Sequence, residues 1–191
     1  MDMDMQPTPA TDHQLLSSWL AVIGMLTMYW SPVERHIDQC VHFLHGKLTL
    51  SKKQKKKPTR LGSKLEFIKC NMPPEIFDQN GFECLVNMTK GTVQIRDVCV
   101  HGVLNSYDHS KIEIGKIDGT KDGHHIENFT IDRDRLENSA KALSVLQEQW
   151  GSIASALYEH TKMANQAVDE RDCAKARSPL APRSTFPKGN R

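Results

Sequence analysis

The sequence lacks the cysteine patterns that mark a disulfide framework or a zinc site. Its cysteines are odd in number and scattered, and no two have the C-x-x-C spacing; they are Cys40, Cys70, Cys84, Cys99 and Cys173. This spacing excludes the regular patterns of disulfide-rich and zinc-binding proteins. Reduced thiols in a cytosolic protein are the simplest interpretation.

Hydrophobic residues are also scarce, at 38% of the 191 residues, and no internal repeat is present. This composition predicts one core diluted by polar termini and loops. The net charge of +2 hides two basic stretches. Residues 47–64 hold eight Lys or Arg and no acidic residue, and residues 171–191 hold six with one Asp.

The longest uncharged run, Gln14 to Val33, has twenty residues, the length of a membrane span. A membrane-anchored protein is therefore one hypothesis, although the acidic Met1–Asp4 does not suit a signal peptide. The apolar spacing favours a core helix instead, because it alternates between three and four and runs on into the charged Glu34–Asp38. The stripe consists of Leu16, Trp19, Ile23, Leu26, Trp30, Val33, Ile37, Cys40 and Leu44. We expect no membrane span and a cytoplasmic location.

This stripe predicts one kinked helix over residues 12–45, preceded by a flexible segment, 1–11. A fresh helix start at Ser31-Pro32-Val33-Glu34 is the second option, because Ser suits the N-cap and Pro the first turn. The basic residues that follow predict a solvated loop over 47–60, since like charges repel and proline breaks a helix.

Two further helices are predicted before the period changes. The first is short, with Leu61, Leu65 and Ile68 on one face, and Met72-Pro73-Pro74 stops it. The second covers residues 80–101, and Gly102 stands where a C′ glycine belongs. Its apolar side is marked by Phe82, Leu85, Thr89, Val93 and Val100.

Residues 111–131 alternate between apolar and polar and predict a β-hairpin, with Asp118-Gly119 as the turn signal. Asp132 then caps a last long helix. Its stripe is Leu136, Ala140, Leu143, Leu146, Trp150, Ile153 and Leu157. The pattern stops after Asp169, so residues 170–191 are predicted to be a disordered basic tail. The predicted fold class is mainly α, with four helices and a small β-hairpin between the third and fourth.

Arg96 and His101, near the predicted end of the third helix, are the residues best suited to chemistry. Arginine supplies a permanently charged fork that matches a phosphate, and histidine moves protons near neutral pH. Together they suffice for metal-free RNA cleavage, in which one group helps the 2′-OH attack and another stabilises charge on the phosphate. The alternative is structural: Arg96 as a surface ion-pair partner and His101 as a helix C-cap.

An arginine, a polar residue, a histidine a few positions on and a glycine directly after it resemble the motif of the HEPN superfamily. A long first helix with Trp30 and Glu34, a short helix, a helix that ends in the motif, a hairpin and a long last helix extend the resemblance over residues 12–165. It implies a four-helix bundle that dimerises, so that the Arg-His motifs of two subunits face one cleft.

The resemblance also implies metal-independent endoribonuclease activity, often in toxin–antitoxin or anti-phage systems. By position, Arg96 would contact the scissile phosphate and His101 would transfer a proton. Asp97 would orient them, and Glu34 would be the polar residue from the first helix. The superfamily more often has Asn after the arginine, and some members are non-catalytic modules that bind RNA or a protein partner. The implied partners are RNA, a second copy and an antitoxin protein, without a cofactor or metal.

Two other groups of residues are candidates for binding RNA or a metal. The lysine run, which would grip an RNA backbone, is equally typical of a solvated loop; it consists of Lys52, Lys53, Lys55, Lys56 and Lys57. His124-His125 lacks a carboxylate or cysteine at ligand spacing and is interpreted as a loop rather than a metal site. Three hypotheses remain open: a dimeric ribonuclease, a non-catalytic dimerising module and a membrane-anchored protein.

Overall fold

The computed structural model describes residues 9–47, 56–120 and 123–177, which form four helices and one three-stranded sheet. Along the chain the elements are α1 (Pro9–Lys47), α2 (Leu61–Asn71), α3 (Gln79–His101), β1 (Val103–Tyr107), β2 (Lys111–Thr120), β3 (Gly123–Asp132) and α4 (Arg133–Arg177). The prediction of a mainly helical fold, with a small antiparallel sheet between the third and fourth helices, is confirmed.

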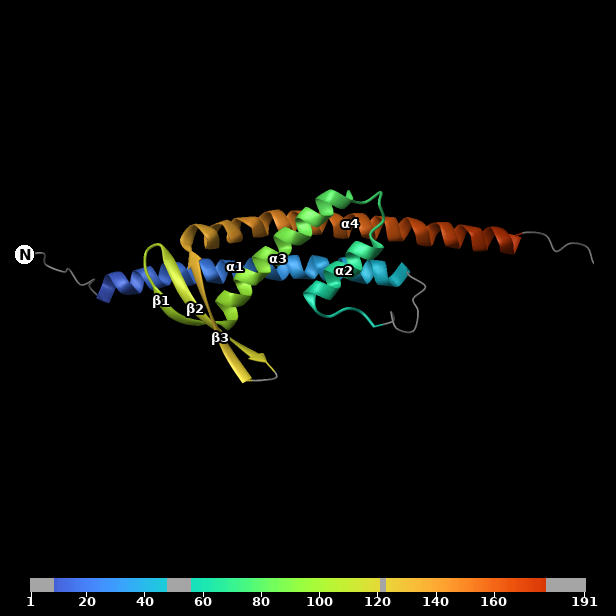
Figure 1. Cartoon of the computed structure of the whole chain (residues 1–191). Helices are drawn as coiled ribbons and strands as arrows, with labels where there is room; N and C mark the ends of the chain where they lie inside the picture. Colours follow the sequence, from blue (N-terminus) through green and yellow to red (C-terminus); the bar gives the residue numbers. More distant parts are fainter. Residues whose placement is uncertain (1–8, 48–55, 121–122, 178–191) are drawn as a thin grey trace, which may run out of the picture.

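The two longest helices, α1 and α4, lie side by side and run in the same direction (Figure 1). Side chains meet in the same order along both helices. The Arg133 guanidinium lies 5.2 Å from the centre of the Trp19 ring, and the rings of Phe43 and Tyr158 are 5.7 Å apart. Because the pair is parallel, the chain has to return along it, and α2, α3 and the sheet form that return.

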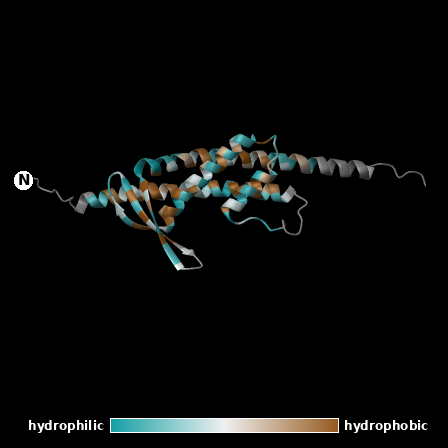
Figure 2. Cartoon of the chain, viewed as in Figure 1, coloured by the Kyte–Doolittle hydropathy of each residue, from teal (hydrophilic) through white to brown (hydrophobic). Residues whose placement is uncertain are grey.

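The stripe predicted for the first helix forms much of the core. Most of its members are buried: Trp19, Leu26, Trp30, Val33, Ile37, Cys40 and Leu44. Hydrophobic residues accordingly gather where α1, α3 and α4 lie together (Figure 2). The helix continues through Pro32, so one helix is confirmed and a fresh start at Ser31 is wrong. By length and composition alone, α1 is also apolar enough to cross a membrane.

Helix α3 crosses the parallel pair and meets both of its members. Phe82, Leu85 and Thr89 are buried as predicted, whereas Val100 is 37% exposed and does not belong to the apolar side. The indole Nε1–H of Trp150 on α4 donates to Thr89 Oγ1 at 3.0 Å. The Trp150 ring also meets Phe82 edge to face, with centroids 5.9 Å apart. These contacts fix α3 across α4 at the centre of the core.

The sheet has the order β1-β2-β3, and both pairs are antiparallel. β2 and β3 pair without a register shift from one end to the other. The turn predicted at Asp118-Gly119 is wrong, because both residues are paired inside this ladder. Buried Ile112 lies opposite buried Ile131, so the register follows the apolar face that covers the helices.

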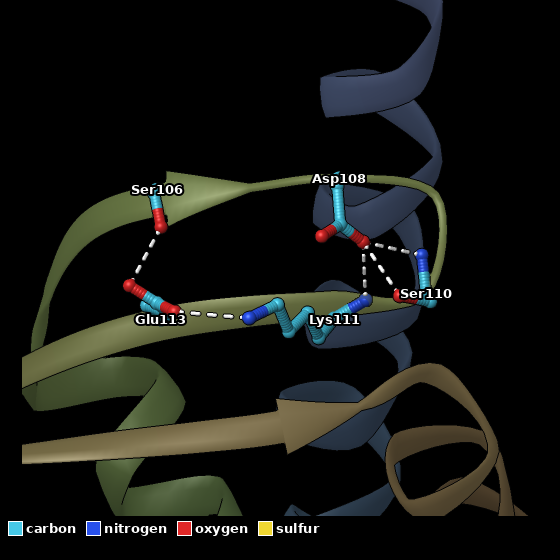
Figure 3. Close-up of polar contacts among 5 residues, drawn as sticks. All are labelled: Ser106, Asp108, Ser110, Lys111 and Glu113. Atoms are coloured by element: carbon cyan, nitrogen blue, oxygen red, sulfur yellow. Dashed lines mark hydrogen bonds and ion pairs between the residues drawn. The ribbon is translucent and has the colours of Figure 1, made fainter.

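Strand β1, which the sequence did not predict, is joined to β2 by a turn built on Asp108. The Oδ1 atom of Asp108 accepts hydrogen bonds from the Ser110 hydroxyl at 2.8 Å, the Ser110 amide at 2.7 Å and the Lys111 amide at 2.9 Å (Figure 3). These donors, the hydroxyl foremost, hold the pKa of the Asp108 carboxyl below its usual value. The Asp108 carbonyl accepts from Trp19 Nε1 at 2.9 Å, which ties the turn to α1.

Gly102 ends α3 by close packing rather than by a left-handed backbone. Gly102 directly follows the last helical residue, as expected, and its φ of −88° and ψ of 167° are extended. A Cβ atom at this position would collide with the Ile114 side chain and lie 2.6 Å from the Val98 carbonyl oxygen. Glycine is therefore required because β2 approaches the helix end closely.

The last helix begins at Arg133, directly after Asp132, as predicted. Its stripe is buried through Leu136, Leu143, Leu146, Trp150, Ile153 and Leu157. The helix continues to Arg177, past Asp169, and so covers eight residues of the segment predicted to be disordered. Of the predicted flexible N-terminus, residues 9–11 belong to α1, whereas residues 1–8 and the end of the tail, 178–191, lie outside the described residues.

Candidate functional site

Arg96, Asp97 and His101 lie in the last two turns of α3, where the sequence predicted them. The helix remains regular through His101. Residues five apart on such a helix differ by about 140° around its axis. Arg96 and His101 therefore leave the helix in different directions, and in the described part of the chain no hydrogen bond joins them. Within one chain the two side chains are therefore not brought together by the helix itself.

The Arg96 side chain is partly buried and already has one partner. Its Nη1 donates to Asp97 Oδ1 at 2.8 Å, and the side chain is 23% exposed. Its Nε is buried and has no partner among the described residues. Because the guanidinium has five N–H donors, the contact with Asp97 leaves others for a phosphate. Asp97 also reduces the net positive charge that such a phosphate would meet.

His101 is exposed and is the last residue of α3. Apolar side chains surround it in sequence: Val100 is 37% exposed, Val103 60% and Leu104 40%. His101, the candidate proton-transfer residue, therefore lies next to exposed apolar residues along the chain.

Glu34 does not join this motif. Its carboxylate lies 3.6 Å from the Nζ atom of Lys64, which also contacts Asp38 at 2.7 Å. Lys64 belongs to α2, and α2 and the C-terminal end of α3 lie over different parts of α1 (Figure 1). The Lys64 side chain is 9% exposed, and its two carboxylate partners satisfy the buried ammonium. The sequence did not single it out, because it reads as the end of a basic loop.

The basic run is described only in part. Lys52, Lys53 and Lys55 lie outside the described residues. Lys56 is exposed, and Lys57 Nζ lies 3.0 Å from His42 Nδ1 near the end of α1. The two described lysines are therefore accessible to a polyanion, and one of them is positioned by a contact with α1.

Four surface pockets formed by described residues lie elsewhere. The largest, with a volume of about 730 Å³, lies between α3 and the start of α4 and is lined by Thr92, Asp132 and Arg135 among others. None of the four is lined by Arg96, Asp97 or His101. Within residues 9–47, 56–120 and 123–177, no three His, Cys, Asp or Glu side chains gather as metal ligands.

The chain matches no protein-family model, no curated protein and no solved structure. His124 and His125, predicted to lie in a turn, belong to strand β3. Sequence reasoning did not predict that three apolar residues of the sheet are exposed: Val103, Ile117 and Ile126. Their alternation with polar neighbours indicates strands, but it does not tell which face of the sheet is exposed.

Proposed function

We propose that this protein is a metal-independent endoribonuclease that acts as a dimer in the cytoplasm, with Arg96 and His101 as its catalytic residues. The observation that carries the proposal is their joint position in the last turns of α3, beside exposed apolar residues that a second copy would cover. The resemblance to the HEPN superfamily agrees with this proposal, and it adds RNA and an antitoxin protein as partners.

In the proposed reaction, His101 assists the transfer of a proton from the ribose 2′-OH as that oxygen attacks the adjacent phosphorus. The new bond joins O2′ to phosphorus, and the bond from phosphorus to the 5′ oxygen of the next nucleotide breaks. That leaving oxygen takes up a proton, and the products are a 2′,3′-cyclic phosphate and a free 5′-OH. Arg96 stabilises the charge that develops on the non-bridging oxygens.

A second copy completes the site in this proposal. Arg96 and His101 of one chain diverge by about 140° around α3, so the groups that act on one phosphate come from two chains. Val100, Val103 and Leu104 supply apolar surface at the place where those chains would meet. Glu34 is left out of the proposed site, because its contacts are with α2.

The second candidate function is a non-catalytic dimerising module that binds RNA or a protein partner. One observation favours it: the Arg96 guanidinium is paired with Asp97 at 2.8 Å, which draws charge away from an incoming phosphate. Replacing Asp97 with Asn would keep a hydrogen-bond acceptor and remove the negative charge. An increase in cleavage by Asp97→Asn would favour a catalytic site restrained by Asp97.

The test is cleavage of a broad panel of RNAs in the presence of chelator. Arg96→Ala should slow cleavage by about 10²–10³, the usual loss for one charge-stabilising donor. His101→Ala should slow it by about 10²–10⁴. His109→Ala and Arg135→Ala are matched controls, since both residues are exposed and lie outside the motif. DNA should resist, because it lacks the 2′-OH nucleophile.

Two results would reject the catalytic proposal. One is a purified dimer that cleaves no RNA on the panel in chelator. The other is cleavage that His101→Ala and His109→Ala reduce equally. If the dimer binds RNA without cutting it, and Arg96→Ala weakens that binding, the non-catalytic module is the better description.

A further inference from the structure

The two edges of the sheet differ in how well they are protected against pairing with another strand. The β1 edge is short, and its register with β2 shifts between Leu104 and Ser106. The β3 edge extends from Gly123 to Asp132 without a register shift against β2, and it contains neither proline nor lysine. Bulges, short length, proline and charged side chains, above all lysine, are means by which edge strands avoid other chains. Of these, β3 has only the charges of Glu127 and Asp132.

The distal half of the β2–β3 hairpin extends away from the helices (Figure 1). β1 pairs only with residues 112–115 of β2, so beyond them the hairpin is a two-stranded ribbon. On it Ile117 and Ile126 lie directly opposite each other and are 57% and 60% exposed. Cross-strand partners share a face of the sheet, so these two side chains form one apolar spot on the ribbon.

We propose that β3 pairs with β3 of a second copy, antiparallel, about a two-fold axis at Ile126. In this register Ile126 faces Ile126 of the second copy, and the Ile117–Ile126 spots of the two ribbons become one continuous apolar ridge. His125 lies opposite Glu127 of the second copy, where an imidazole N–H can donate to the carboxylate, and the symmetry repeats this pair. His124 faces Asn128 of the second copy. A two-fold contact requires such a self-complementary surface.

Neighbouring registers lack this complementarity. Moving the axis to Glu127 would place two glutamates directly opposite each other, and like charges in such positions destabilise a strand pair. Moving it to His125 would place two histidines opposite each other and would lose both contacts between His125 and Glu127. The register at Ile126 also needs only the projecting tips, residues 123–129, to overlap. The helices of the two copies then lie at opposite ends of the joined ribbon and do not meet.

This contact is separate from the proposed catalytic dimer. The motif on α3 leads through Gly102 into β1, which lies on the opposite edge of the sheet from β3. A β3-linked pair therefore has about five strand spacings of 4.8 Å, or roughly 24 Å, between its two β1 strands, too far for the two motifs to act on one phosphate. If both contacts form, the protein assembles from four chains.

The experiment measures the mass of the full chain in solution by light scattering at one fixed concentration. Ile126→Lys puts a charge on the edge strand, and it should halve the mass of the wild-type assembly. Val145→Lys is the matched control, because Val145 is also an exposed apolar residue but lies on α4, outside the sheet and outside the proposed contact. Circular dichroism confirms that both variants fold.

A charge exchange tests the register. His125→Glu should also halve the mass, because it places glutamate opposite Glu127 of the second copy, and adding Glu127→His should restore the mass. The proposed catalytic dimer remains distinguishable: Ile126→Lys gives two chains if that dimer exists and one chain if it does not. The β3 contact is overturned if Ile126→Lys leaves the mass unchanged, or if Val145→Lys reduces it equally.

Discussion

Replacing Trp150 with alanine is expected to destabilise the protein by about 4 kcal/mol, because three interactions are lost together. The side chain is fully buried between α3 and α4. Removing so large a core side chain usually costs about 3–5 kcal/mol, including the cavity that remains. The edge-to-face contact with Phe82 and the hydrogen bond to Thr89 Oγ1 place the expected loss inside that range rather than below it. For a chain of this length the melting temperature should fall by roughly 8–16 °C.

The assay is urea unfolding followed by circular dichroism, at one protein concentration because self-association adds to apparent stability. Trp150→Phe should lose less stability than Trp150→Ala. The Thr89 hydroxyl still donates to the Leu85 carbonyl at 2.7 Å, and a ring remains in contact with Phe82. Val145→Ala is the control on the same helix, because Val145 is 42% exposed and should change stability by about 0.5 kcal/mol or less. An unchanged midpoint for Trp150→Ala would refute the assignment of Trp150 to the core.

Three further predictions concern stability and thiol reactivity. Gly102→Ala should destabilise by about 1–3 kcal/mol because its Cβ collides with β2, whereas Gly91→Ala, in open space on α3, should stabilise by about 1 kcal/mol; thermal melts compare them. Burial raises the pKa of the Cys99 thiol to about 11, so iodoacetamide near pH 8 should label exposed Cys84 and spare Cys99 until denaturant is added, as peptide mass spectrometry will show. Asp108→Ala should lower stability at neutral pH. Because the pKa of Asp108 is lowered, its contribution to stability is present above about pH 4, the unfolded-state pKa, and is lost as the pH falls through the folded-state pKa. The melting temperatures of the two proteins should therefore converge in acid.

The helices were predictable because their stripes repeat with the helical period over many residues. The stripe from Trp19 to Leu44 forms the core as expected, and it marks one helix although Pro32 interrupts the composition. The end of α3 was also predictable, but for a different physical reason. Gly102 was expected there as a helix-ending glycine, whereas the close approach of Ile114 is what requires a glycine at this position. A contact between residues distant in sequence is not visible in local composition.

The sheet was less predictable because local turn signals compete with the pairing of whole strands. Asp118-Gly119 is a good hairpin turn in isolation. The register that places buried Ile112 opposite buried Ile131, however, pairs Asp118 and Gly119 with residues of β3. β1 gave no signal, since its residues are mostly exposed. For the candidate site, the position of Arg96 and His101 at a helix end followed from sequence. The groups that would act together with Arg96 and His101 could not be predicted, because the two side chains diverge and their partners depend on how chains associate.

The parallel arrangement of α1 and α4 also determines when the core can form during synthesis. Arg133 meets Ser18 across 115 positions of sequence, so the helix that covers α1 is translated after all the other described elements. Contacts so distant along the chain slow folding relative to a bundle of neighbouring antiparallel helices. At about 5–20 residues per second, the apolar stripe of α1 waits roughly 5–20 s on the ribosome before its partner helix emerges. During that interval the uncharged segment from Gln14 to Val33 lacks the helix that later covers its apolar stripe.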